Sequence, residues 1–189
     1  MSTHTAANLS YVGSAPGKGA AFYDRNAWFT PSEYVEAARA AMGRIDLDPF
    51  SDVEANRVVQ ATRFFTEQDD ALTKDWADGC PPGGQRLWLN PPFGRDVIDK
   101  VVDKFTLEFK AGHFSEAIVL TNNATETQWF HELLAVASAI CLPSKRIKFW
   151  NADGKAVSSN TRGQTFFYIG ADTERFRAQF SRFGAVLLT

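Results

Sequence analysis

Short apolar runs alternate along the sequence with longer segments whose apolar residues recur three or four positions apart. The longer segments predict amphipathic helices, because residues at this spacing share one face of a helix. The clearest example consists of Val97, Ile98, Val101, Val102, Phe105 and Phe109. From this spacing and from the start signals described next, helices are predicted over residues 31–42, 51–61, 97–109, 125–137 and 176–183.

Polar residues of the capping-box type mark several of the predicted helix starts. In residues 30–33, 51–54 and 125–128, a Ser or Thr stands three positions before a Glu or Gln, so both side chains can bind free backbone N–H groups. We therefore expect Thr30, Ser51 and Thr125 to be N-caps. Residues 67–76 are expected to contain a further helical turn.

The short apolar runs predict strands over residues 44–50, 63–66, 86–89, 117–121, 139–142, 147–150, 165–169 and 185–188. Strands that alternate with helices indicate an α/β domain with a doubly wound, mostly parallel sheet, and with ligands at the carboxyl ends of the strands. The 189 residues suffice for one domain, which we place at residues 25–189. Residues 1–24 are rich in small and polar residues and are expected to form a flexible leader.

Composition narrows the function classes. The formal net charge of -2 gives no overall sign of nucleic-acid binding, although a local basic surface is compatible with it. Two cysteines and three well-separated histidines provide neither a disulfide framework nor a zinc site at the usual ligand spacing. No apolar run is long enough to cross a membrane, and the N-terminus does not read as a secretory signal. These features favour a cytoplasmic protein without a metal.

The segment Asn90-Pro91-Pro92-Phe93 lies directly after a predicted strand and before the clearest predicted helix, where α/β domains place their active sites. Its plain interpretation is a proline-rich turn. Its functional interpretation is methyl transfer to an exocyclic amine, whose lone pair is delocalised into a heteroaromatic ring. Such an amine becomes a better nucleophile when two acceptors bind its hydrogens and favour a pyramidal nitrogen.

Each residue of this segment has a place in that chemistry. The side-chain oxygen of Asn90 and the main-chain carbonyl of Pro91 supply the two acceptors. Pro91 and Pro92 stiffen the loop, and Phe93 offers a ring on which an extruded base can stack. We therefore predict that these four residues form the catalytic segment, and that the reaction needs no metal, nucleophilic cysteine or histidine base.

The same segment resembles the (Asn/Asp/Ser)-Pro-Pro-(Tyr/Phe/Trp) motif of amino-methyltransferases that use S-adenosylmethionine. More motifs in the same order are similar to the phage-type DNA N-6-adenine methyltransferase family: WFTP at 28–31, DLDPF at 46–50, EAN at 54–56, DAL at 70–72, DW at 75–76, WLNPPFG at 88–94, TETQWF at 125–130 and RIKF at 146–149. The resemblance covers roughly residues 28–170. It implies a Rossmann-like methyltransferase fold, S-adenosylmethionine as cofactor, double-stranded DNA as partner, and a phage or prophage protein in a bacterial cytoplasm.

The resemblance also implies a cofactor site. Residues Thr30 and Pro31 are expected to flank the methionine end, and Asp48, Pro49 and Phe50 to form the main cradle. At a strand end the Asp48 carboxylate can pair with the cofactor's ammonium, and the following helix can direct N–H groups at its carboxylate; alternatively, Asp48 only caps the turn. Glu67 is the expected partner of the ribose hydroxyls, with Asp69 and Asp70 as rivals. The sequence departs from the wider methyltransferase pattern at residues 51–53, which contain no glycine.

A compact basic group is the expected contact to DNA phosphates, although a solvated basic face gives the same pattern. It consists of Lys145, Arg146, Lys148 and Arg162. The neighbouring Phe149 and Trp150 either stack on bases or pack inward. Trp76 either packs against the cofactor's adenine or belongs to the core.

Together these features predict a DNA adenine N6-methyltransferase that transfers a methyl group from S-adenosylmethionine to a flipped adenine. Methylation of cytosine N4 or of a protein amide needs the same acceptor pair and is one alternative. A catalytically silent nucleotide-binding or DNA-binding module with this fold is the other, and failure to bind the cofactor would favour it.

Overall fold

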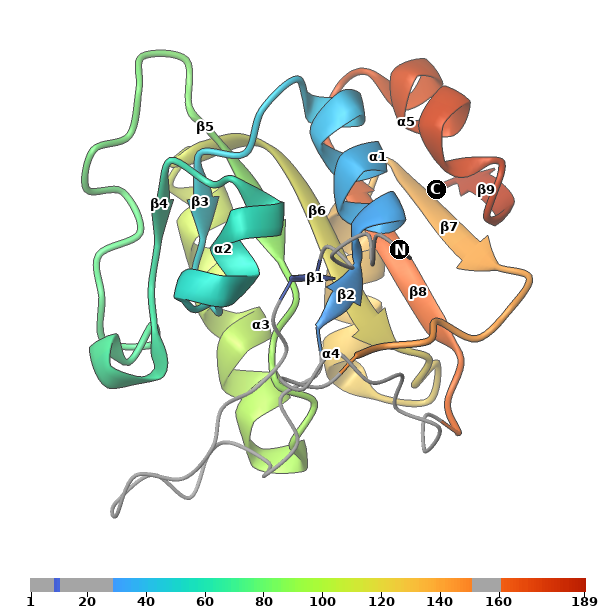
Figure 1. Ribbon diagram of the computed structural model, residues 1–189, viewed down its shortest axis with the longest axis horizontal. Coiled ribbons are helices and arrows are strands. Elements are labelled where there is room, and N and C mark those ends of the chain that lie inside the picture. The colour runs from blue at the N-terminus through green and yellow to red at the C-terminus, as the bar shows by residue number, and fades with distance from the viewer. Residues whose placement is uncertain (1–8, 11–28, 151–160) are drawn as a thin grey trace, which may run out of the picture.

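A seven-stranded sheet with helices on both faces forms the centre of the computed structural model, which describes residues 9–10, 29–150 and 161–189 (Figure 1). The strand order is β4-β3-β5-β6-β8-β7-β9. The strands span Leu47–Asp48 (β3), Arg63–Phe64 (β4), Gln85–Leu89 (β5), Phe114–Asn122 (β6), Ala139–Pro143 (β7), Gln164–Ile169 (β8) and Gly184–Leu188 (β9). A separate two-stranded ribbon pairs β1 (Leu9–Ser10) with β2 (Thr30–Pro31).

The sheet is mixed but mostly parallel. Strand β3 is parallel to β4 and β5, and β5 is parallel to β6. Strand β8 is antiparallel to β6 and β7, and β9 is antiparallel to β7. The helices are α1 (Ser32–Met42), α2 (Val53–Val59), α3 (Arg95–Lys110), α4 (Gln128–Val136) and α5 (Thr173–Phe180), with a 3₁₀ turn η1 at Glu67–Asp69. This arrangement confirms the predicted fold class.

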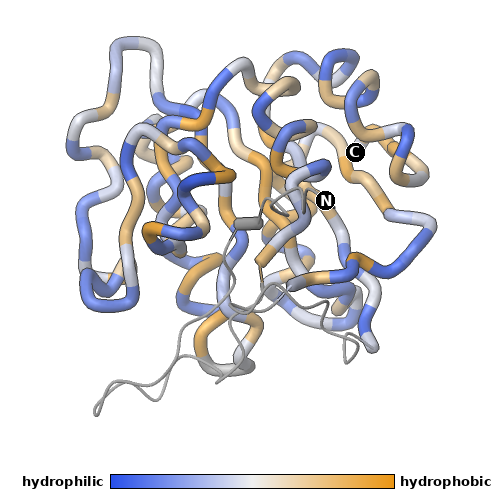
Figure 2. Tube along the Cα trace, in the orientation of Figure 1, coloured by the Kyte–Doolittle hydropathy of each residue, from blue (hydrophilic) through white to orange (hydrophobic). Residues whose placement is uncertain are grey.

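Alternating side chains of the central strands divide the core into two layers. Trp88 and Ile118 pack against α1, α2 and α5 on one face of the sheet. Their neighbours Leu89 and Val119 pack against α3 and α4 on the other face. Figure 2 shows hydrophobic residues gathered along the central strands, where both layers meet. Because both faces are covered, the strand ends are the parts of the sheet that can present polar groups to a ligand.

The strand order reverses direction at β3 and β5. The chain leaves β3 through α2 and reaches β4 on one side, and it leaves β5 through α3 and reaches β6 on the other side. Open α/β sheets bind ligands in the crevice outside the carboxyl ends of the strands at such a switch point. Asp48 ends β3 and Asn90 directly follows β5, so the fold brings both sequence-predicted residues to this crevice.

The predicted N-caps are each wrong by one or two positions. The N-cap residues are Pro31, Asp52 and Thr127 rather than Thr30, Ser51 and Thr125. Asp52 takes the role in α2 because its carboxylate accepts the Ala55 backbone N–H at 2.7 Å. Before α4, residues 124–127 first form a turn in which the Thr127 N–H and hydroxyl both donate to the Ala124 carbonyl.

The predicted strand over residues 147–150 is also wrong. Its only strand-like pairing within the described residues is a single bridge between Trp150 and Phe29. Ile147 and Phe149 are buried, so their alternation reflects a covered side and not a ladder of hydrogen bonds. The helical turn expected in residues 67–76 is limited to η1. The predicted leader lies outside the described residues apart from β1.

Candidate active site

Asn90 lies at the carboxyl end of β5 with its side chain completely buried. Its Nδ2 donates to the Thr30 hydroxyl at 2.6 Å, whereas its Oδ1 is buried and has no partner in the part of the chain that the structure describes. A buried acceptor without a partner costs free energy, and native proteins keep few of them. Pro91 and Pro92, which follow, are buried as well. The segment therefore presents an unpaired amide oxygen from a stiff loop.

Asp48 occupies the matching position at the end of β3. Its side chain is also completely buried; Oδ1 accepts the Phe50 backbone N–H at 3.3 Å, and Oδ2 has no partner among the described residues. Burial raises the pKa of the Asp48 carboxyl well above its ordinary value of 3.8, because the charged form is desolvated. A cation placed against Oδ2 would offset that desolvation, so the site suits an ammonium group.

The N-terminus of α2 differs from the expectation that its N–H groups receive the cofactor's carboxylate. The Ala55 N–H already binds the Asp52 side chain, and Asp52 carries an acidic group at this helix end. The Asp52 carboxylate thus caps the start of α2, and we assign it a structural role. The nearby Ser51 hydroxyl is buried and hydrogen-bonds the Asp48 carboxyl, whose pKa it lowers in opposition to the larger effect of burial. The sequence indicated Ser51 only as a helix cap.

The three candidate acids after β4 have different surroundings. Glu67 is partly buried, and its Oε1 has no partner within the described ranges. The Asp69 carboxylate accepts from the Thr66 backbone N–H at 2.9 Å and from the Thr66 hydroxyl at 2.7 Å, which completes a capping box. Asp70 is exposed, and its carboxylate accepts the Leu72 N–H at 3.3 Å. Of the three acids, Glu67 is therefore the one with a buried carboxylate oxygen that has no partner within the described ranges.

The unpaired oxygens share one edge of the sheet. Those of Asp48, Glu67 and Asn90 all follow the carboxyl ends of the adjacent strands β3, β4 and β5. The other buried polar atoms without a described partner belong to Arg39, Trp88 and Thr106. A group of unpaired acceptors at a switch point is what a polar, donor-rich ligand would satisfy.

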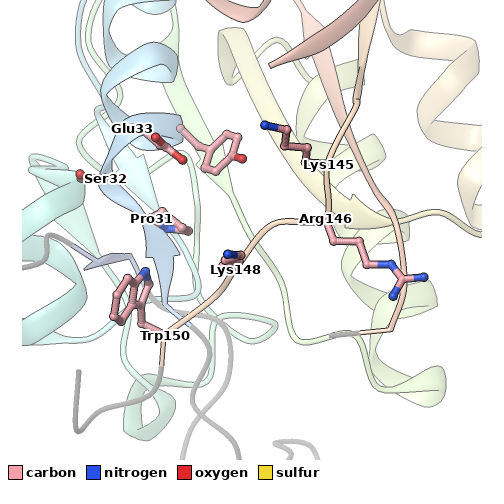
Figure 3. Close-up of a pocket in the computed structure, with 8 residues that line it drawn as sticks. Pro31, Ser32, Glu33, Lys145, Arg146, Lys148 and Trp150 are labelled. Atoms are coloured by element: carbon pink, nitrogen blue, oxygen red, sulfur yellow. The ribbon is translucent and has the colours of Figure 1, made fainter. Parts of the chain in front are cut away.

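A pocket of about 410 Å³ is lined by Pro31, which directly follows Thr30, the hydrogen-bond partner of Asn90 (Figure 3). One wall comes from the start of α1 and the other from the segment after β7; the lining residues are Pro31, Ser32, Glu33, Tyr34, Lys145, Arg146, Lys148 and Trp150. In Figure 3, Lys145 extends toward the Glu33 side of the pocket, whereas Arg146 points away from it. The fold thus places three residues of the predicted basic group, Lys145, Arg146 and Lys148, in the same pocket lining as Pro31. Arg162 is exposed at the start of β8 and does not line the pocket.

The aromatic candidates have different positions. Phe149 belongs to the buried core, which excludes it as a stacking surface, whereas the half-buried Trp150 lines the pocket. Phe93 is half-buried and packs against the core cluster that includes Tyr34. The sequence does not indicate that Ser32, Glu33 and Tyr34 line a pocket, because the pattern at these positions predicts only the start of a helix.

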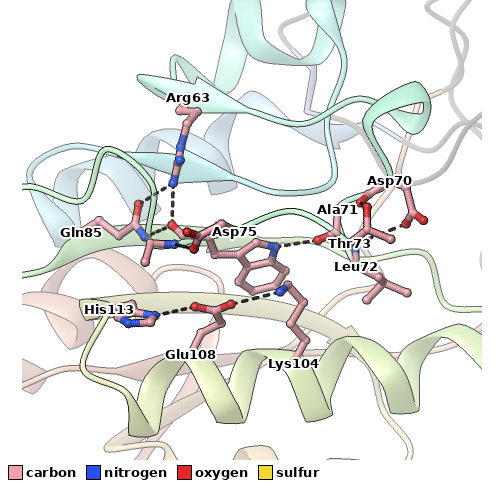
Figure 4. A network of polar contacts seen from close by, with 12 residues as sticks. Arg63, Asp70, Ala71, Leu72, Thr73, Asp75, Gln85, Lys104, Glu108 and His113 are labelled. Atoms are coloured by element: carbon pink, nitrogen blue, oxygen red, sulfur yellow. Dashed lines mark hydrogen bonds and ion pairs between the residues drawn. The ribbon is translucent and has the colours of Figure 1, made fainter.

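Trp76 is a core residue at the centre of a polar network near the opposite edge of the sheet (Figure 4). Its Nε1 donates to the Ala71 carbonyl at 2.8 Å, and its own carbonyl accepts from Arg63 and Gln85. The Lys104 ammonium lies 5.3 Å from the ring centroid. Trp76 also contacts Phe50 edge-to-face at 6.4 Å, so it supports the loop after β3 from the core.

The mixed, mostly parallel sheet and the acceptors at its switch point are consistent with the class of methyltransferases. The sequence matches the family model described as DNA N-6-adenine-methyltransferase (Dam) over residues 20–182, which is most of the chain. The chain belongs to this family, as the resemblance implied. No individual curated protein matches the sequence. Family membership makes adenine N6 methylation of DNA the activity to expect, with S-adenosylmethionine as the usual methyl donor of methyltransferases.

In the described part of the chain, no group of three or more His, Cys, Asp or Glu residues could hold a metal ion. No helix found there is both long and apolar enough to cross a membrane.

Proposed function

We propose that the protein transfers a methyl group from S-adenosylmethionine to N6 of an adenine that has been extruded from double-stranded DNA. The observation that carries the proposal is the unpaired, buried Asn90 Oδ1 at the switch point of a chain that belongs to this family. A plain turn would gain nothing from a desolvated acceptor without a partner. An amine that approaches Asn90 would satisfy it.

The acceptors after β3 and β4 fit the polar groups of S-adenosylmethionine. Asp48 Oδ2 can accept from its ammonium, and Glu67 Oε1 can accept from its ribose hydroxyls. Pro49 and Phe50 continue the loop beside Asp48, and Thr30 and Pro31 lie on β2, where Thr30 contacts Asn90. Asp70 is less suited to the ribose because it is exposed and already accepts a backbone N–H. When bound, the cofactor supplies an electrophilic methyl group on a sulfonium centre.

The catalytic segment acts on the target amine. Asn90 Oδ1 and the Pro91 carbonyl accept hydrogen bonds from its two hydrogens, which draws them out of the base plane and localises the lone pair on the nitrogen. Pro91 and Pro92 hold the two acceptors in fixed positions, since proline restricts the backbone. Phe93 offers the exposed part of its ring to the extruded base. The segment thereby raises the nucleophilicity of the amine and orients it at the same time.

Access to Asn90 requires movement. The side chain is completely buried, and Pro91 and Pro92 beside it are buried too. A substrate amine reaches Oδ1 only when the groups that cover this acceptor move aside. We therefore propose that DNA binding opens the crevice, and that extrusion of the adenine supplies the hydrogen-bond donors that Asn90 lacks.

The basic group provides the DNA contact. Lys145, Arg146 and Lys148 are exposed on the segment between β7 and β8, and they border the pocket next to Pro31. Exposed Lys and Arg side chains bind phosphates without reading the sequence. Trp150 offers a ring at the same pocket, and Arg162 adds a cation at the start of β8. These residues would hold the duplex while Asn90 acts on the extruded base.

The test is incubation of the protein with isotopically labelled S-adenosylmethionine and an unmethylated duplex, followed by mass spectrometry of the nucleosides. We expect labelled N6-methyldeoxyadenosine, and no label in a control duplex of G·C pairs alone. Labelled N4-methyldeoxycytidine would instead make the protein a cytosine methyltransferase, and label in a protein substrate would make it an amide methyltransferase. If calorimetry also detected no cofactor binding, the chain would be a catalytically silent module.

A further inference from the structure

The amide of Asn90 needs a partner to fix its orientation. The oxygen and nitrogen ends of an amide have nearly the same shape, so hydrogen bonds decide which end faces which neighbour. In this protein Nδ2 donates to the Thr30 hydroxyl at 2.6 Å and Oδ1 is left as a free acceptor. The reversed amide would accept from the Thr30 hydroxyl, which can also donate, but it would leave both N–H groups of Nδ2 unpaired in a fully desolvated position and turn donors toward the incoming amine. The observed orientation is therefore the less costly one.

Thr30 is itself held from two sides. It belongs to β2 directly before α1, whose residues Val35, Ala38 and Met42 are completely buried in the core. On its other side, Phe29 exchanges two backbone hydrogen bonds with Trp150, at 2.7 and 3.0 Å. Thr30 is completely buried between these anchors, 60 positions before Asn90 in the sequence. The segment that carries the basic group is thus tied to the residue that holds the catalytic amide.

We propose that Thr30 is a positioning residue for methyl transfer: its hydroxyl fixes the Asn90 amide so that the oxygen, and not the NH₂ group, faces the amine. This inference rests on the proposed function. It gives Thr30 a role different from that of a cofactor contact, because a cofactor contact acts on binding, whereas a residue that orients Asn90 acts on the rate of transfer.

The test compares single-turnover methylation by wild-type protein and by Thr30→Val, Thr30→Ala, Thr30→Ser, Asn90→Ala and Thr30→Val/Asn90→Ala, at saturating cofactor and DNA. Thr30→Val keeps the side-chain shape and removes the acceptor, so we expect the rate constant to fall about 10- to 100-fold. Thr30→Ala should show a similar loss if the valine variant does not fold. Thr30→Ser restores the hydroxyl and should retain the wild-type rate within about threefold. The Kd for S-adenosylmethionine and the KM for DNA should stay within about threefold of wild type.

The double variant separates a positioning role from an independent one. If Thr30 acts through Asn90, Thr30→Val should slow the Asn90→Ala protein by less than about threefold, because the group that it orients is already gone. Multiplicative effects of the two changes, a loss confined to cofactor affinity, or a wild-type rate in folded Thr30→Val would each overturn the inference. In the last case an active wild type would leave the proposed function intact, whereas a wild type that does not methylate adenine would overturn both.

Discussion

The two ends of strand β5 each carry a buried amide side chain, and the two amides differ in what their oxygens bind. At the start of the strand, Gln85 donates through Nε2 to the Trp76 carbonyl and accepts at Oε1 from Arg63. After the end of the strand, Asn90 donates to Thr30 and its oxygen accepts nothing within the described residues. Both side chains are at most 2% exposed, so water does not account for the difference.

The polar groups around Gln85 and around Asn90 differ in the same way, being paired in one case and unpaired in the other. Around Gln85, the Glu108 carboxylate pairs with both Lys104 and His113, and none of the side chains in this network leaves a buried polar atom unpaired (Figure 4). Around Asn90, the unpaired oxygens of Asp48 and Glu67 lie at the same edge of the sheet. A satisfied polar network stabilises a fold, whereas unsatisfied groups reduce its stability and are retained where a ligand completes them. We therefore interpret the edge at Gln85 as structural and propose that the edge at Asn90 is the functional one.

The largest effects on methylation and on stability are expected when Asn90 and Gln85 are each replaced by alanine. Asn90→Ala removes one acceptor for the amine, and we expect single-turnover methylation to fall about 100- to 1000-fold with little change in cofactor affinity. Gln85→Ala leaves the Trp76 carbonyl short of a donor, and we expect it to lower the free energy of unfolding by about 1–3 kcal/mol. Urea denaturation and single-turnover assays on both proteins check the pair. Equal losses of rate in the two folded variants would remove the distinction between the edges.

A smaller effect is expected at Phe93. Loss of a stacking ring costs about 1–3 kcal/mol per base, so Phe93→Ala should weaken capture of the extruded adenine roughly 5- to 150-fold. Phe93→Tyr keeps the ring and should retain much of the activity. Fluorescence of 2-aminopurine at the target position reports extrusion in both variants. Unchanged fluorescence with Phe93→Ala would show that the ring serves only the core cluster that it contacts.

The basic group should affect DNA binding without affecting the crevice. Replacing Lys145, Arg146 and Lys148 by alanine should make the slope of log affinity against log salt shallower, by up to about 2.7 if all three bind phosphates. Cofactor affinity should not change. Lys110→Ala, an exposed change at the far end of α3, serves as the matched control. A salt dependence equal to that of the wild type would place the DNA contact on another surface.

The smallest effect is the pH dependence of stability in the ligand-free protein. Because burial raises the pKa of Asp48, its contribution to stability is complete below the ordinary value of 3.8 and is lost as the pH rises through the folded-state pKa. The Thr66 backbone N–H lowers the pKa of Asp69, so that carboxylate contributes above its ordinary value and its contribution is lost as the pH falls. Relative to wild type, Asp48→Asn should therefore gain stability with rising pH and Asp69→Asn should lose it. Thermal unfolding between about pH 2 and 8 checks both signs, because the contribution of Asp69 changes below 3.8 and that of Asp48 changes above it.

The layers of the fold could be predicted from the sequence, because they depend on local patterns, and the catalytic role of the segment at 90–93 stays a prediction. Alternation of short apolar runs with amphipathic segments identifies the strands and helices, and Asn90-Pro91-Pro92-Phe93 stands out by its place after a strand. The same local patterns misplaced the strand at 147–150, since the alternation there comes from the burial of Ile147 and Phe149, and within the described residues only Trp150 forms a strand-like bridge.

Contacts between distant segments could not be predicted in this way. Thr30 has the pattern of a helix cap, yet its hydroxyl binds Asn90, and only the packing of α1 on the sheet brings the two together. Among the acids at 67, 69 and 70, the sequence favoured Glu67 by its place after a strand but left the other two as rivals. They differ only because Asp69 completes a capping box and Asp70 is exposed, which leaves Glu67 with an unpaired oxygen.

The most direct test of the account uses two aspartates that lie two positions apart. Asp46 is paired with the Arg86 backbone N–H at 2.7 Å and with Arg44 at 2.6 Å, whereas Asp48 Oδ2 has no partner within the described residues. The measurement is the Tm of wild type, Asp46→Asn and Asp48→Asn with and without S-adenosylhomocysteine, which keeps the ammonium of the cofactor. At 100 times the Kd, binding is worth about 2.7 kcal/mol, or about 5–10 °C for a chain of this size. We predict that shift for wild type and Asp46→Asn, and little or no shift for Asp48→Asn. A shift in Asp48→Asn equal to that of the wild type would contradict the proposal that the cofactor binds at the edge of the sheet that carries the unpaired oxygens.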